Sequence, residues 1–173
     1  MSTSLYELSV GAYLQSVKGV QGFLRKGREF AETEGLSLDE IAGTRLRETM
    51  LPFRFQVQAV RHQTIDTVTA FETGEFGPPS GMDPDNYDQL QALVDRTLEE
   101  LEAVDADAVN QHAGRTLYFR MPGVELPFKV EQFVMSFALP NLYFHATTAY
   151  DILRIAGVPL EKRDFLGPLA VMR

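Results

Sequence analysis

The sequence predicts an all-α fold, an antiparallel four-helix bundle with one β-hairpin before its last helix. Three stretches repeat apolar residues at three- and four-residue steps, which is typical of helices that bury one face, and a fourth is apolar on almost every side, as a central helix is. One stretch changes to a two-residue alternation, which is typical of strands. A long connection rich in glycine and proline separates the second helix from the third, so we expect it to cross over part of the bundle.

The first two long helices begin at recognisable signals. We expect the first over residues 5–32, because Ser4 and Glu7 have the spacing of a capping box and a stripe of apolar residues follows them. We expect the second over residues 51–73. It starts beside Pro52, and the missing N–H of a proline costs nothing in the first turn of a helix.

The third helix is expected over residues 84–104. Asp83 supplies an N-cap acceptor, and Pro84 suits the first turn. The stretch 105–114 has the composition of a polar linker. The tail, residues 162–173, has no clear period, and we predict no regular element there.

A β-hairpin is expected next to the last helix. Apolar and polar residues alternate over residues 115–121 and again over 124–129, and Pro122 and Gly123 between them indicate a turn. An isolated hairpin is marginally stable in water, so we expect this one to pack against helices.

The last helix is expected over residues 130–156 and is apolar on almost every side. Pro140 lies in its interior, where we expect a kink that frees the carbonyl of Ser136. A helix that is apolar all round is central to its domain or lies in a subunit interface. We therefore expect a homodimer with a two-fold interface.

The composition indicates one soluble acidic domain over residues 1–173. Asp and Glu number 24 against 16 Lys and Arg, which gives a net charge of -8 and argues against nucleic acid or an anionic membrane as partner. No apolar stretch is long enough to span a membrane. The first residues do not have the pattern of a signal peptide, so we expect a cytoplasmic protein. The chain has no cysteine, which excludes disulfides and thiolate chemistry.

Few residues could carry chemistry. The sequence has no glycine-rich phosphate loop, nucleophile elbow, HExxH or CxxC motif, and only three histidines. His145 lies in the middle of the most apolar helix, with Asn141 and Thr148 on the same strip. Burying such groups without partners costs on the order of 1–3 kcal/mol, so each must be satisfied. The strip is either a structural hydrogen-bond network or a functional centre.

Two further sets of polar residues have the same two interpretations. His62 and Asp66 are spaced as an i,i+4 pair, which forms an ordinary surface contact unless His62 faces His145 across the bundle. The second set either lines the mouth of a pocket between the second helix and the hairpin or belongs to an ordinary polar face; its members are Arg54, Gln56, Gln58, Tyr118 and Arg120.

Several sequence runs resemble a known family. The run Phe-Ala-Leu-Pro-Asn-Leu-Tyr-Phe-His over residues 137–145 is the most specific, and similar runs follow over 147–154, 157–160 and 162–167. They resemble the uncharacterised domain-of-unknown-function family numbered nineteen-ninety-three, in the DinB/YfiT-like superfamily of predicted metalloenzymes. The resemblance covers nearly the whole chain.

The resemblance implies a four-helix bundle, often dimeric, with a divalent metal such as Zn²⁺, Ni²⁺ or Fe²⁺. Metal-binding members of the superfamily use one histidine from the second helix and an HxxxH pair from the last. Carried over to this chain, the ligands are His62 and His145, with Asn141 in the place of the first histidine of the pair. A neutral amide oxygen is a weak ligand for these metals beside imidazole.

The function predicted from the sequence is therefore a small-molecule site in the bundle core. His145 is the candidate catalytic residue, either as general acid or base or beside a metal that supports transferase, isomerase or hydrolase chemistry. The candidate substrate-binding residues are Arg54, Gln58, Tyr118 and Thr148. The alternative is a non-catalytic ligand-binding or dimerisation module in which the histidines and the asparagine are structural. The sequence does not decide whether the protein is an enzyme.

Overall fold

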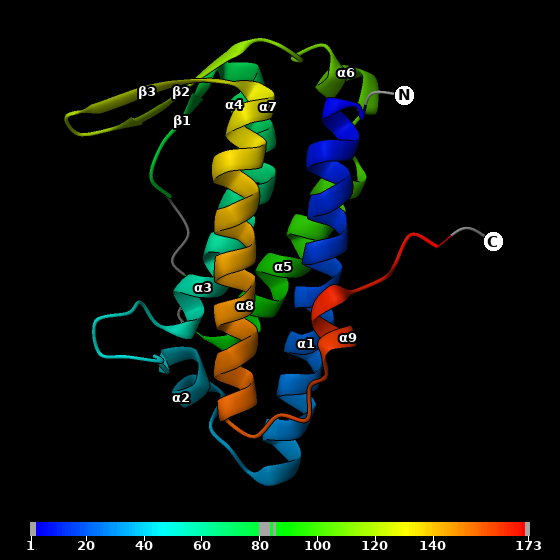
Figure 1. Ribbon diagram of the computed structural model, residues 1–173. Coiled ribbons are helices and arrows are strands. Elements are labelled where there is room, and N and C mark those ends of the chain that lie inside the picture. The colour runs from blue at the N-terminus through cyan, green and yellow to red at the C-terminus, as the bar shows by residue number, and fades with distance from the viewer. Residues whose placement is uncertain (1–2, 80–83, 85, 172–173) are drawn as a thin grey trace.

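The computed structural model describes residues 3–79, 84 and 86–171. It is mainly helical, with a small three-stranded sheet at one end (Figure 1). Among the described residues, four long helical segments contain most of the structure, and three of them include a π-helical turn, labelled η. The segments are η1 (Glu7–Gly11) with α1 (Ala12–Glu34); α3 (Phe53–Arg61), η2 (His62–Asp66) and α4 (Thr67–Thr73); α5 (Tyr87–Glu102); and α7 (Val130–Phe133), η3 (Val134–Ala138) and α8 (Leu139–Ile155).

The long segments pack side by side. Helix α1 contacts α5 and α8, and α3 contacts the same two helices. The helices predicted over residues 5–32, 51–73 and 130–156 are confirmed to within a few residues. Shorter helices surround them: α2 (Leu38–Gly43), α6 (Ala106–Asn110) and α9 (Lys162–Leu166). The structure therefore confirms a mainly helical fold and adds a small sheet and short helices that the predicted four-helix bundle did not include.

The predicted hairpin is confirmed as β2 (Thr116–Met121) and β3 (Val124–Lys129), and a third strand joins it. Strand β1 (Glu75–Phe76) pairs parallel to β2, which gives the order β1-β2-β3. The inner half of the hairpin packs against the helices through the fully buried Leu117. The sequence did not predict β1, because two residues are too few to show an alternating pattern.

The predicted start of the third helix was wrong. Helix α5 begins at Tyr87, and the side chain of Asn86 caps it by accepting a hydrogen bond from the backbone N–H of Gln89 at 3.0 Å. Pro84 lies before the helix, and Asp83 lies outside the described residues. Asn86 is as good an N-cap residue as aspartate, and its position three residues downstream decides where the helix begins.

The sequence also missed two short helices. Helix α6 lies in the predicted polar linker and is capped by Asp105, whose side chain accepts from the N–H of Ala108 at 2.8 Å. Helix α9 lies in the tail that showed no period. It begins with a reciprocal capping box between Glu161 and Asp164. Helices of five residues have too few positions to show an apolar stripe, so only their caps were visible in the sequence.

The last helical segment continues through Pro140 without the predicted kink, and Figure 1 shows it as one nearly straight rod. The π turn η3 comes directly before the proline, and within it the N–H of Leu139 bonds the carbonyl of Val134, five residues earlier. The side chain of Asn141 donates to the carbonyl of Phe137 at 2.7 Å, whereas the prediction concerned Ser136. The changed backbone pairing accommodates the proline where a regular helix would bend.

Helix α9 packs against α1 with almost no space between the backbones. A methyl group at Gly19 would lie 2.5 Å from the carbonyl oxygen of Phe165, and one at Gly167, whose φ is +64°, would lie 2.7 Å from the carbonyl oxygen of Gln15. The ammonium group of Lys26 adds an ion pair to the carboxylate of Asp164 at 2.7 Å. In the part of the chain that the structure describes, no helix is both long and apolar enough to cross a membrane.

The close approach of α9 predicts opposite effects of alanine at two glycines of α1. Gly19→Ala should lower the free energy of unfolding by roughly 1–3 kcal/mol, because the new methyl group overlaps a backbone atom that cannot rotate away. Gly22→Ala should raise it by about 0.5–1 kcal/mol, because nothing lies within 4 Å of the added carbon and alanine favours helix. Chemical denaturation of both variants measures the difference. Equal effects would show that α9 is not held as described.

Candidate functional site

His145 is held in a fixed orientation between α8 and α3. Its Nδ1 atom lies 2.8 Å from Oε1 of Gln56, and Nε2 of Gln56 donates to the carbonyl of Leu51 at 2.8 Å. A carbonyl can only accept, so the glutamine must turn its NH₂ group toward Leu51 and its oxygen toward the histidine. Nδ1 of His145 therefore carries the hydrogen, and Nε2 carries the lone pair.

The surroundings of His145 keep its ring neutral. The rings of Phe55 and Phe144 meet it edge-on, with centroids at 5.9 and 5.2 Å. Burial lowers the pKa of His145 from 6.5 to about 4, and the nearby charge of His62 contributes in the same direction. At neutral pH the side chain is an acceptor at Nε2 and has no second proton to give.

His62 is also held at Nδ1, which lies 3.1 Å from the carboxylate of Asp66. The pair is not an ordinary surface contact, because His62 is 8% exposed and its ring stacks on Phe76 with centroids 4.5 Å apart. His62 lines a cavity of about 210 Å³ together with Asp66, Phe76 and the start of the following loop. The lining of this cavity includes neither His145 nor Asn141.

The other two residues of the polar strip bond to their own helix. The side chain of Asn141 donates to the carbonyl of Phe137, and the hydroxyl of Thr148 donates to the carbonyl of Phe144 at 2.8 Å. Thr148 is buried. Both contacts are those expected of structural side chains that serve the helix backbone.

The remaining predicted residues are not brought together. Arg54 and Gln58 are half-buried on α3, two turns and one turn before His62 respectively. Tyr118 lies in β2, opposite Glu75 of β1, and its ring is covered by the guanidinium of Arg120. Strand β1 follows the far end of this helical segment, about 30 Å from its start at 1.5 Å per residue. Arg54 and Tyr118 therefore do not line the mouth of one pocket.

Gln56 contributes most to holding His145, although the sequence placed it only in the looser polar set with Arg54 and Gln58. It is 2% exposed, although it lies in a helix half that is otherwise rich in polar residues. A buried glutamine must have both ends of its amide satisfied, and here those ends connect the chain before α3 to α8. Its position between Phe55 and Val57 gave no indication in the sequence that it is buried.

The side chains present do not fit a tight transition-metal site. His62 and His145 each keep Nε2 as a possible ligand, since their Nδ1 atoms are bonded to Asp66 and Gln56. Asn141 would supply only an amide oxygen. Over residues 3–79, 84 and 86–171, no three His, Cys, Asp or Glu side chains are grouped so as to hold a metal ion. Two imidazoles and an amide are a weak donor set for Zn²⁺, Ni²⁺ or Fe²⁺.

The buried neutral state of His145 predicts its titration. Its Cε1–H resonance should shift with a midpoint near pH 4 in NMR spectra. The unfolded chain, with a histidine pKa near 6.5, takes up the proton first as the pH falls, so the free energy of unfolding should decrease between pH 6.5 and 4. His145→Asn should remove this part of the pH dependence. A midpoint at pH 6 or above would contradict the proposed surroundings of the ring.

Comparisons with known proteins show the family to which the chain belongs. The family model described as Domain of unknown function (DUF1993) matches residues 5–166. Among solved structures, the chain is similar to a DinB family member protein from Shewanella denitrificans, with 28% sequence identity and a TM-score of 0.82 over 98% of this chain and 95% of that chain. No curated protein matches the sequence significantly. The resemblance inferred from the run over residues 137–145 is thus confirmed, and the chain belongs to the DUF1993 family with a DinB-like fold.

Proposed function

We propose that the protein binds a small molecule beside His145, in the core of a four-helix bundle, and that Nε2 of His145 accepts a hydrogen bond or a proton from it. The observation that supports this most is the chain of contacts from Leu51 through Gln56 to Nδ1 of His145. A histidine whose Nδ1–H is anchored in this way has one tautomer and one ring orientation, which is the arrangement used where Nε2 acts on a ligand.

The chemistry that fits His145 is that of an acceptor. Transfer, isomerisation and hydrolysis all include a step in which a substrate O–H, N–H or S–H gives up a proton, and Nε2 is the atom that would take it. The lowered pKa makes general acid catalysis by the resting enzyme unfavourable at neutral pH. The role proposed here is therefore that of a base or hydrogen-bond acceptor.

His62 would supply a second contact to a ligand, through Nε2 of its ring. Its Nδ1–H is bonded to Asp66, and its ring borders the 210 Å³ cavity. Arg54 and Gln58 are spaced at four-residue steps before it and are the candidates for binding a polar part of the substrate. Thr148 is a weaker candidate, because its hydroxyl is bonded within α8.

A dimerisation role has separate support. The outer side of α8 includes Pro140, Phe144 and Ile155, and the last two are 56% and 74% exposed. Large apolar side chains exposed on a helix often lie in an interface between subunits. We propose that this side of α8 is the two-fold contact of a homodimer, whether or not His145 acts in catalysis.

The accessibility of Nε2 can be measured by acylation with diethyl pyrocarbonate, which attacks the lone pair of neutral imidazole. Mass spectrometry should find His145 modified, and the rate should stay nearly constant between pH 7.5 and 5.5 because the ring remains neutral. A histidine with an ordinary pKa slows over that range as it becomes protonated. An unreactive His145 in the folded protein would favour the structural interpretation.

His145→Asn is the matched variant, because the Asn amide lies near the position of Nδ1 and can keep the bond to Gln56 while Nε2 is lost. It should leave the melting temperature within a few degrees of wild type and abolish thermal stabilisation by compounds that protect His145 from acylation. His145→Leu also strands Gln56 and should cost about 1–3 kcal/mol. Stoichiometric zinc, nickel or iron in protein purified without a histidine tag, absent from His145→Asn, would overturn the proposal, because the metal would occupy the lone pair of Nε2.

The dimer predicts a light-scattering mass of twice the chain mass of 19.4 kDa. Phe144→Glu should return the mass to that of one chain, because a carboxylate would have to be buried in the apolar contact. Leu169→Glu is the control, since Leu169 is equally exposed but lies in the tail. A single-chain mass for the wild-type protein over a wide concentration range would exclude this interface.

A further inference from the structure

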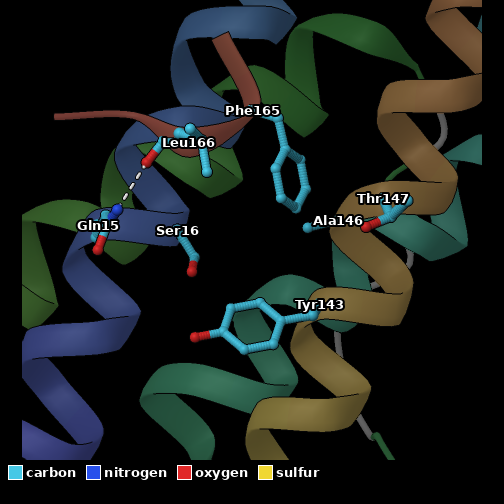
Figure 2. A pocket seen from close by; sticks show the side chains of 7 residues that line it. All are labelled: Gln15, Ser16, Tyr143, Ala146, Thr147, Phe165 and Leu166. Carbon is cyan, nitrogen blue, oxygen red and sulfur yellow. Dashed lines mark hydrogen bonds between the residues drawn. The ribbon is translucent and has the colours of Figure 1, made fainter. Parts of the chain in front are cut away.

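A second cavity lies on the other flank of α8, away from His145. Its volume is about 340 Å³, which is at the small end of the range for small-molecule sites. Figure 2 shows side chains of three helices around it, with Ser16 of α1 and the rings of Tyr143 and Phe165 directed into the same space. The lining residues are Gln15, Ser16, Tyr143, Ala146, Thr147, Phe165 and Leu166.

The wall formed by α9 is fixed in place. The side-chain NH₂ of Gln15 donates to the carbonyl of Leu166 at 3.0 Å, the contact drawn in Figure 2. The ring of Phe165 meets that of Tyr150 edge-on, with centroids 5.9 Å apart. Together with the close backbone contact between Gly19 and Phe165, these interactions hold α9 in place as one wall of the cavity.

The lining carries no formal charge and includes acceptors on two of its residues, beside the hydroxyl groups of Tyr143 and Thr147, which can donate or accept. The hydroxyl of Ser16 donates to the carbonyl of Ala12, and the NH₂ group of Gln15 donates to Leu166, so both residues meet a ligand with oxygen lone pairs. An ion placed here would lose hydration without gaining a partner of opposite charge.

The apolar part of the lining favours a flat ring. Phe165 and Tyr143 present aromatic rings on two sides of the space, and Ala146 leaves room between them. Aromatic rings gain from edge-to-face or offset contacts in addition to the apolar area that they bury. The cavity volume fits one ring with a small substituent better than a larger molecule.

We propose that this cavity binds a small neutral aromatic molecule that carries an N–H or O–H donor, with the ring between Phe165 and Tyr143 and the donor directed at Ser16 or Gln15. This goes beyond the function proposed at His145, and it does not depend on it. The site would select uncharged aromatic amides or phenols over aromatic acids and amines.

The test uses three probes of nearly the same shape on the full-length protein. Benzamide is neutral and has donors, methyl benzoate is neutral without donors, and benzoate is an anion at pH 7. In ¹H–¹⁵N NMR titrations, benzamide should shift the resonances of residues 15–19, 143–147 and 165–166. The dissociation constant of methyl benzoate should be about fivefold higher than that of benzamide, because methyl benzoate lacks one neutral hydrogen bond to the protein. Benzoate should bind still more weakly.

Two variants locate the site, and two others are controls. Ser16→Leu and Thr147→Leu place a larger side chain in the lining, and each should raise the dissociation constant for benzamide at least tenfold. Asp151→Leu adds a leucine to the exposed side of α8 one turn beyond the cavity and should change it less than twofold. His145→Asn should also leave it unchanged. Benzamide binding by His145→Asn therefore tests this cavity independently of the function proposed at His145.

Three results would overturn the proposal. They are equal affinity for benzoate and benzamide, resonance shifts centred on residues outside the lining, and no shift at millimolar benzamide. The comparison of probes uses only the wild-type protein, so it stands even if a variant fails to fold. Thr147 is exposed, and its replacement should leave the fold intact.

Discussion

The backbone pairing before Pro140 is the constraint on which the candidate site depends. The π turn η3 adds one residue to the helix, which rotates everything after it by ~100° relative to a regular helix. That rotation sets which side of α8 carries His145 and brings it to Gln56 of α3. His62 lies in a second π turn, η2. Such turns are rare in helices and are frequent at functional sites.

The two histidines are held by the same kind of contact at Nδ1, although they do not line one described cavity. Each directs Nδ1 at a side-chain oxygen, and each ring lies against phenylalanine. In metal enzymes the same anchoring prepares imidazoles as ligands. Here the third position holds Asn141, whose amide bonds to its own helix, so the anchored rings are better suited to a ligand with hydrogen-bond donors.

The sequence predicted the elements in which a pattern of apolar residues repeats, and it missed the contacts between residues that are far apart along the chain. Apolar periodicity identified the long helices, and alternation identified the hairpin, because burial repeats along each of them. The four-residue spacing of His62 and Asp66 predicted their contact, and His145 was noticed as a polar residue in the most apolar helix. The sequence pattern could not show that Phe76 of strand β1 covers His62. Nor could it show that Arg54 lies near the start of the segment α3–α4, whereas Tyr118 lies in β2, beside the strand that follows the other end of that segment. The cavity of Figure 2 was missed because α9 forms one wall.

The two proposed sites use opposite sides of one helix. Tyr143 and His145 are two residues apart, and two residues correspond to ~200° around a helix, so their side chains diverge. Tyr143 faces α1 and α9, whereas His145 faces α3. The lining of the second cavity includes neither His145 nor Gln56, so the two sites share no described lining residue. Variants of the two sites should therefore act additively, as independent sites in one packed structure do.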